Sequence, residues 1–192
     1  MVNLLTLSFA AVALTPLAGA VPTARDVAAA PEPFSFAKWV DEIIAKPEEA
    51  ATPQQALDAY YAYANSTSTD NVLPETASKM HKRAICNSIV GAEAPIPDAV
   101  ECINYLARLN TQTCEVYKGT DHVSFVVRGN AEMIGIRPDV NGASTICNNV
   151  ARAGGKIMDA CSRADNTVEG QEQTPDNAGI AVHIIRRGTG PR

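Results

Sequence analysis

The C-terminal half of the chain alternates between the period of a β-strand and that of an α-helix. RAICNSIVG mixes β-branched with small residues and ends at a glycine, which predicts a short first strand. PIPDAVECINYLARLN carries apolar residues at helical spacing, and Asp98 with Glu101 resembles a capping box. This second segment therefore predicts a helix that packs on a sheet.

The next segments predict two strands, a second helix and a last strand. TCEVYKGTDHVSFVVRG has the pattern of a hairpin that turns at residues 118–121, and Gly129-Asn130 is expected to bend its second strand before AEMIGI. With Ser144 as its N-cap, STICNNVARAGGKIMDACSRA places apolar residues along one helical stripe, and Gly154-Gly155 indicates close packing there. GIAVHIIRR alternates as the last strand.

The resulting order of elements, β-α-β-β-α-β, predicts the fold class. It is the order of the split βαβ arrangement, an α+β fold in which two helices cover one face of a four-stranded antiparallel sheet. Residues 84–192 are enough for a small core of this kind, which disulfides would strengthen.

Residues 21–83 contain no cysteine and predict two short helices followed by a linker. In FAKWVDEIIAKP the apolar residues keep helical spacing up to Pro47, and PQQALDAYYAYAN repeats the pattern after Thr52-Pro53. The polar tract NSTSTDN is typical of a linker, and Asn65 within it begins a glycosylation sequon expected in a surface loop. We interpret residues 21–83 as a pro-region whose helices either fold back on the C-terminal half or stay loose.

The first twenty residues have the pattern of a secretory signal peptide. An apolar run from Leu4 to Leu17 precedes Ala18-Gly19-Ala20, a small-x-small pattern that predicts cleavage after Ala20. The run is too short for a transmembrane helix. We therefore expect a secreted, extracellular protein.

A dibasic pair, Lys82-Arg83, separates the cysteine-free region from the part that carries every cysteine. Kexin-type proteases of the secretory pathway recognise such a pair, and this one follows a signal peptide and a polar linker. We therefore expect three segments: a signal peptide at 1–20, a pro-region at 21–83 and a mature domain at 84–192.

Composition and motifs exclude several classes of function. The chain has 192 residues, a net charge of −5, 46 % hydrophobic and 19 % charged residues, so it is globular and not basic enough to bind nucleic acid. It contains no HExxH, no GxSxG and no phosphate-binding glycine loop, and we assign no catalytic residue, metal or cofactor. Two isolated histidines could take part in catalysis or bind a metal: His122 and His183. Three scattered acidic residues are expected to be surface charge: Asp121, Glu132 and Asp139. Three arginines give the C-terminus a local positive charge: Arg186, Arg187 and Arg192.

The five cysteines are expected to form two disulfides and leave one thiol, because an exported chain meets an oxidising environment. Cys147 and Cys161 lie about 21 Å apart along one helix, too far for a bond that needs Cα atoms within about 7 Å. Antiparallel helices would instead pair Cys86 with Cys147 and Cys102 with Cys161. Cys114 is then the free thiol, available for a dimer contact.

Residues 84–186 resemble small secreted fungal proteins with a killer-toxin-like α/β fold, a group that includes smut killer toxins and effector candidates. The resemblance lies in PDAVECINYLARL, TCEVY, GNAEMIG and STICNNVARAGGKIMDAC. Where such relatives tend to carry a further cysteine, this chain has Val126-Val127. The resemblance implies a secreted effector or toxin that binds a target or perturbs membranes, with no shared catalytic residues.

Two classes of role remain open from the sequence. The first is a non-catalytic secreted interaction protein that uses its sheet face or an edge strand to bind a host or competitor protein or a cell surface. The second is a small secreted enzyme or enzyme inhibitor whose site assembles from residues distant in sequence. A pocket that held His122 or His183 beside a carboxylate would favour catalysis.

Overall fold

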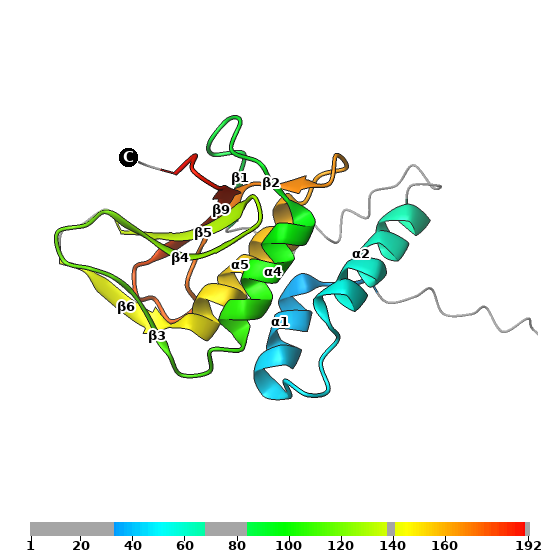
Figure 1. The fold of residues 1–192 in the computed structure, drawn as a ribbon, viewed down its shortest axis with the longest axis horizontal. Coiled ribbons are helices and arrows are strands. Elements are labelled where there is room, and N and C mark those ends of the chain that lie inside the picture. The colour runs from blue at the N-terminus through cyan, green and yellow to red at the C-terminus, as the bar shows by residue number, and fades with distance from the viewer. Residues whose placement is uncertain (1–32, 68–83, 138–140, 191–192) are drawn as a thin grey trace, which may run out of the picture. The chain divides into compact units, whose positions relative to one another are not determined.

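A computed structural model describes residues 33–67, 84–137 and 141–190, which include helices packed on antiparallel sheets (Figure 1). The helices are α1 (Phe36–Ala45), α2 (Pro53–Thr67), α4 (Ile96–Ala107) and α5 (Cys147–Cys161). The strands are β1 (Ile85–Cys86), β2 (Ala94–Pro95), β3 (Thr113–Val116), β4 (His122–Arg128), β5 (Ala131–Ile136), β6 (Ala143–Ile146), β7 (Thr167–Val168), β8 (Gly170–Gln173) and β9 (Ala181–Arg186). The predicted α+β class is confirmed. Ala20, Lys82, Arg83, Asp139 and Arg192 lie outside the described residues.

The main sheet has five antiparallel strands in the order β1-β8-β9-β5-β4, and α4 and α5 pack on one of its faces (Figure 1). The predicted last strand is confirmed as β9, in which Val182 and Ile184 enter the main core. Ile185 points into a smaller cluster with Ala92 and Ile134. Side chains alternate across a strand, so β9 contributes to a core on each face of the sheet.

The predicted hairpin of residues 113–128 is wrong in its pairing. β3 pairs with β6, with Cys114 opposite Thr145, whereas β4 forms its hairpin with β5. Gly129, expected only to bend a strand, has a φ of 51° and reverses the chain between β4 and β5. Ser144 lies within β6, so α5 begins later than predicted, at Cys147. Alternating polarity marks a strand but does not choose its neighbour.

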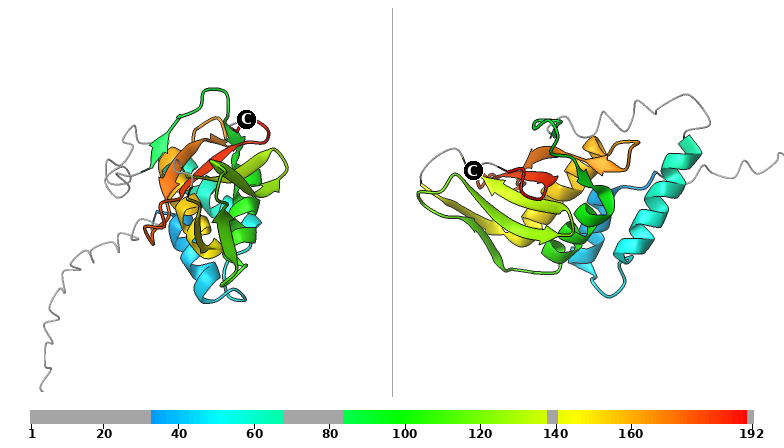
Figure 2. Two further views of the ribbon diagram at one scale, coloured as in Figure 1. Left: turned by 90° about the vertical axis from the view of Figure 1, so that its left-hand side faces the viewer. Right: turned by 45° about the horizontal axis from the view of Figure 1, so that its top comes forward.

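The close packing predicted at the two glycines of α5 is confirmed, and the structure shows that it occurs on both sides of the helix. A Cβ on Gly154 would lie 2.7 Å from Cε of Met133, on the side of the sheet. A Cβ on Gly155 would lie 2.9 Å from Cα of Ala37, on the side of α1. The helix pair α4 and α5 therefore lies between the sheet and the N-terminal helices, as three layers (Figure 2).

The predicted disulfides are wrong, although their number is right. Cys86 bonds Cys161, with Cα atoms 5.3 Å apart. Cys86 is in register with Gly170 of β8, and a Cβ on that glycine would lie 2.8 Å from Sγ of Cys161. The end of α5 therefore meets the sheet edge formed by β1, and not the predicted partner Cys102.

The second disulfide joins Cys114 to Cys147, with Cα atoms 5.0 Å apart. The pairing of β3 with β6 places Cys114 opposite Thr145, two residues before Cys147, so the predicted free thiol is in fact bonded. A dimer through Cys114 consequently has no thiol to use. With sequence separations of 75 and 33 residues, each disulfide is worth about 4 kcal/mol in the chain-entropy model.

The free thiol is Cys102, which is fully buried. Its Sγ lies 3.8 Å from the carbonyl oxygen of Ala131 in β5, because this side of α4 faces the sheet and not α5. Burial raises the pKa of the Cys102 thiol to about 12. The antiparallel course of the two helices was predicted correctly, but the helix face that carries Cys102 was not.

Asn65 lies in the last turn of α2 and is exposed, rather than in the surface loop expected for its sequon. Its glycosylation stays a prediction.

Candidate functional site

His122 and Asp121 form a local pair beside the turn before β4. Nδ1 of His122 lies 2.7 Å from Oδ1 of Asp121. This hydrogen bond is the largest cause of the lowered pKa of Asp121, whose side chain is 74 % exposed. Because the carboxylate is well hydrated, the pair adds little stability and presents one imidazole and one carboxylate to solvent.

His183 lies elsewhere, on the central part of β9, where it is in register with Ile134 of β5. Its side chain is buried, and burial lowers its pKa. Strand β5 separates β9 from β4 and therefore His183 from His122. The carboxylate of Glu132 has a structural partner, since its Oε2 accepts a hydrogen bond from the backbone N–H of Gly188 at 3.2 Å. His122, His183 and Glu132, the described residues considered for acid or base chemistry, therefore do not converge on one site.

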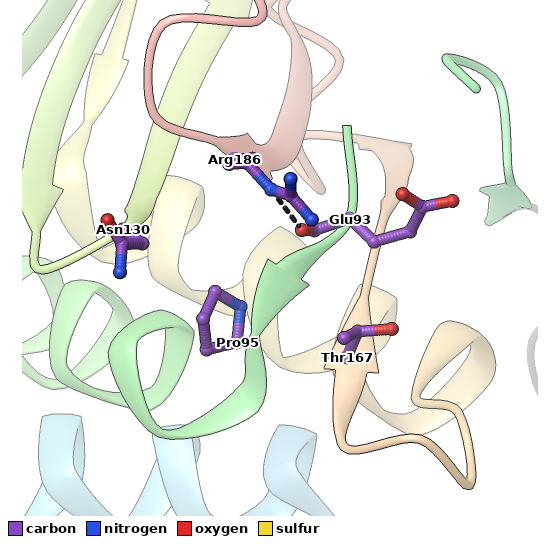
Figure 3. Close-up of a pocket in the computed structure, with 5 residues that line it drawn as sticks. All are labelled: Glu93, Pro95, Asn130, Thr167 and Arg186. Carbon is purple, nitrogen blue, oxygen red and sulfur yellow. Dashed lines mark hydrogen bonds between the residues drawn. The ribbon is translucent and has the colours of Figure 1, made fainter. Parts of the chain in front are cut away.

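An open pocket of about 360 Å³ lies where four segments of the main fold meet (Figure 3). It is lined by Glu93, Pro95, Asn130, Thr167 and Arg186. Nε of Arg186 donates to the carbonyl oxygen of Glu93 at 3.0 Å, as the dashed line in Figure 3 marks. The Glu93 carboxylate accepts from Arg163 at 3.1 Å, and the Thr167 hydroxyl donates to Asp165 at 2.5 Å.

These contacts define what the pocket can do chemically. The pKa of Glu93 is lowered, first by its own backbone N–H and then by Arg163, so its carboxylate is ionised and neutralised by a guanidinium. The hydroxyl of Thr167 is committed to Asp165. The charged and hydroxyl groups of the lining are therefore engaged by neighbouring protein groups, and the lining residues do not include the paired nucleophile and base that covalent catalysis needs.

A more extensive site is the face of α5 that holds α1. Three residues spaced along this face, Arg152, Gly155 and Asp159, form what we call the α5 stripe. They stand three and four residues apart, which places them on one side of a helix. Each contacts α1 at a different point along its length.

Asp159 caps the start of α1. Its Oδ1 accepts from the backbone N–H of Phe36 at 2.6 Å, and its Oδ2 accepts from the Ser35 hydroxyl at 2.6 Å and the Ala37 N–H at 3.1 Å. A carboxylate at this position satisfies N–H groups that have no partner within the helix and complements the helix dipole. Two backbone N–H groups at the start of α1 are thus capped by a residue more than 120 positions away in sequence, while the hydroxyl of the N-cap residue Ser35 accepts from the N–H of Lys38 at 3.3 Å.

Gly155 and Arg152 complete the stripe. The missing side chain of Gly155 lets the backbone of Ala37 and Phe36 approach, since a Cβ there would lie 2.9 to 3.1 Å from their backbone atoms. Nε of Arg152 donates to Oδ1 of Asp41 at 2.8 Å. The three contacts fix the position of α1 along α5, with the two helices antiparallel.

An aromatic cluster joins α1 to α2 over this interface. The ring of Phe36 lies 4.9 Å from that of Phe34, 6.3 Å from that of Trp39 and 5.1 Å from that of Tyr60, measured between centroids. Phe36 and Trp39 are each 1 % exposed, and Nε1 of Trp39 donates to the carbonyl oxygen of Ala51 at 2.8 Å. Burial raises the pKa of Tyr60. The N-terminal helices therefore pack as a unit.

Two polar contacts tie this unit to other parts of the fold. Nη1 of Arg108, at the end of α4, donates to the carbonyl oxygen of Pro47 at 3.2 Å. The Tyr61 hydroxyl donates to the side-chain oxygen of Asn166, in the turn after α5. Residues of the C-terminal half thus hold both the connection between α1 and α2 and the second half of α2.

The glycine pair predicted close packing at Gly155, but no pattern in the sequence assigned a contact to Arg152 or Asp159. A signal was present, because these two charged residues share one side of α5 with a glycine at three- and four-residue spacing. Charges on a helix face opposite an apolar stripe usually indicate exposure to solvent, however, and that pattern hid the interface.

Within the described part of the chain, no group of three or more histidine, cysteine or acidic side chains is arranged to hold a metal ion. None of the described helices combines the length and the hydropathy that a membrane span requires. Among known protein families, a domain of unknown function, DUF8794, matches residues 81–186, which is more than half of the chain and excludes α1 and α2. No curated protein and no solved structure matches.

Proposed function

We propose that this chain, which belongs to the DUF8794 family of unknown function, is exported as a precursor and acts outside the cell as a non-catalytic interaction protein of the effector or toxin kind. Its partner would be a host or competitor protein or a cell surface, and nucleic acid is not expected. A protease of the secretory pathway would cut the precursor after Arg83.

The two disulfides carry this proposal. Cys86–Cys161 and Cys114–Cys147 fasten both ends of α5 to strands, so the crosslinks belong to the folded core. Disulfides of this structural kind persist in oxidising compartments and are rare in the cytosol. Together with the signal-like residues 1–20, they support export.

The limits of the family match support the proposed cut. The matched region begins at His81, one residue before the dibasic pair Lys82-Arg83, and continues to Arg186 at the end of β9. The helices α1 and α2 precede it. The family therefore corresponds to the part of the chain that follows the pro-region, which supports a mature domain that starts at Ala84.

The separation of the candidate acid and base groups supports a role in binding. His122 is paired with its neighbour Asp121, and His183 is buried on a different strand. A catalytic acid or base must lie within hydrogen-bond reach of the substrate and of its partner groups. Binding through an exposed surface makes no such demand.

Export and cleavage are tested by expressing the full chain in a host with a kexin-type protease and recording denaturing mass spectra of the medium. We expect a fragment that begins at Ala84 and retains two disulfides. An Arg83→Ala variant is the matched control and should remain uncut. Secreted chains that still carry residues 21–83 covalently would refute the cleavage, and a chain retained in the cytosol with five reduced thiols would refute export.

The role in binding is tested by applying the purified secreted protein to plant leaf tissue and to competing fungi. We expect cell death or growth arrest, and we expect reduced and alkylated protein to be inactive because the crosslinked fold is lost. Hydrolysis of a peptide, glycoside or ester substrate by the same preparation would contradict the non-catalytic assignment.

A further inference from the structure

We propose that residues 33–67, which we call the leader segment, remain bound to the α5 stripe after the chain is cut, so that the working protein is a non-covalent complex of two chains. This inference rests on the proposed cut after Arg83. It assigns to the pro-region a lasting role as a second subunit, and it names the partner of the stripe as an amphipathic helix from the same precursor.

The apolar part of the interface has the burial of a protein core. Phe36, Trp39, Val40 and Ile43 of α1 are between 0 and 1 % exposed and belong to the same hydrophobic cluster as Ile157 of α5. Permanent interfaces between subunits share this character, because they resemble a domain core divided in two. A cut between the leader segment and β1 removes none of these contacts.

The polar part of the interface adds specificity. Asp159 accepts three hydrogen bonds from the start of α1, and Arg152 pairs with Asp41 about one and a half turns further along α1. Gly155 between them leaves room only for a closely approaching backbone at Ala37. A helix that makes all three contacts must offer backbone N–H groups in its first turn to Asp159, a small residue to Gly155 and a carboxylate to Arg152. α1 has these groups at matching positions.

Release of the leader segment would be unfavourable for the C-terminal half. α5 forms the middle layer of the fold, so departure of α1 would expose the apolar surface now covered by Phe36, Trp39 and Ile43. Exposed apolar patches of this kind are rare on soluble monomers. Asp159 would also lose its three donors. Retention avoids both costs.

The test uses the full chain with Lys82-Arg83 replaced by the recognition sequence of a site-specific protease. The purified protein is cut and then analysed by native size exclusion and native mass spectrometry. We expect the two fragments to co-elute as a 1:1 complex, with the emission of Trp39, the only tryptophan, unchanged after the cut. Separate elution of the fragments, or a red shift of Trp39 on cutting, would overturn the proposal.

Two variants measure the contribution of the stripe. Asp159→Ala should raise the dissociation constant of the cut complex at least about tenfold, read by dilution and Trp39 emission, since hydrogen bonds to a charged acceptor are lost. Glu115→Ala, which removes an exposed carboxylate on β3, is the matched control and should leave the constant unchanged. Equal constants for both variants would contradict the assigned contacts.

Circular dichroism of the uncut variants shows whether each folds. If Asp159→Ala does not fold, Ser35→Ala removes one of the same hydrogen bonds from the α1 side and should act in the same direction. Failure of the proposed function is distinguishable, because an absent natural cut or absent export appears in the mass spectra of the native secreted chain. The engineered cut reports retention in either case.

Discussion

Replacing Gly155 with alanine tests whether α1 lies where the structure places it. The added Cβ would lie 2.9 Å from Cα and 3.1 Å from N of Ala37, and 3.1 Å from the carbonyl oxygen of Phe36. All three are backbone atoms, so no side chain can rotate away. α1 or α5 must shift as a whole, against a densely packed interface.

Two opposing effects set the magnitude for Gly155→Ala. In a helix interior, alanine is more favourable than glycine by about 1 kcal/mol of helix propensity. Overpacking costs about 1–3 kcal/mol, and contacts with backbone place this site in the upper part of that range. The net expectation is a loss of about 1–2 kcal/mol in the free energy of unfolding, or about 5 °C in Tm for a unit of this size.

Urea denaturation followed by Trp39 fluorescence and by far-UV circular dichroism measures the change. Trp39 is the only tryptophan, and it is 1 % exposed in α1, so its emission reports directly on whether this helix is packed against the rest of the fold. Gly154→Ala is the matched control, because its Cβ would meet side chains only, Cε of Met133 at 2.7 Å and Cγ1 of Ile103 at 3.0 Å, and side chains can move where backbone cannot, so it should cost less. A Gly155→Ala protein as stable as the wild type, or more stable, would refute the placement of α1.

Three further predictions concern the cysteines and His183. Iodoacetamide should leave the native protein unlabelled and should add one label, at Cys102, in urea without reductant. The reason is that this thiol is buried and its pKa is raised to about 12. Labelling in the native state would contradict that burial. The double variant Cys114→Ala/Cys147→Ala should lose about 4 kcal/mol in the free energy of unfolding and about 10 °C in Tm, measured by thermal unfolding. A crosslinked peptide that contains Cys102 in a non-reducing digest would disprove the pairing. Burial lowers the folded pKa of His183 below the ordinary value of 6.5, so the unfolded chain binds the proton more readily and stability falls as the pH drops below about 6.5. His183→Leu should weaken the dependence of the urea midpoint between pH 7.5 and 5, and an unchanged dependence would show that other groups cause it.

The cysteines illustrate how far sequence reasoning reaches. An odd number of cysteines beside a signal-like N-terminus predicted two disulfides and one thiol, and that count is confirmed. Which cysteines pair depended on two features that local patterns do not carry: β3 pairs with β6, and Cys102 faces the sheet. A one-residue difference in register or a rotation of one helix moves a thiol to another partner.

The candidate site shows the same division. The apolar positions of FAKWVDEIIAKP predicted the helix α1, and Gly154-Gly155 predicted close approach to α5. Nothing in those patterns joined the two, since Asp159 and Arg152 resemble ordinary surface charges until α1 lies beside them. The two histidines share no sequence pattern that would place them together, and the structure puts His122 on β4 and His183 on β9.

By itself the sequence determined the positions of α1, α2, α4, α5 and β9 to within a few residues, along with the α+β class, because hydrophobic periodicity is a local property that each segment carries alone. The tertiary structure alone decided the strand partners, the disulfide pairs and the docking of α1 on the α5 stripe. Hydrophobic burial is non-directional, so a pattern states which face must be covered and leaves open what covers it. Close packing, hydrogen bonds and the fit of backbone against Gly155 make that choice.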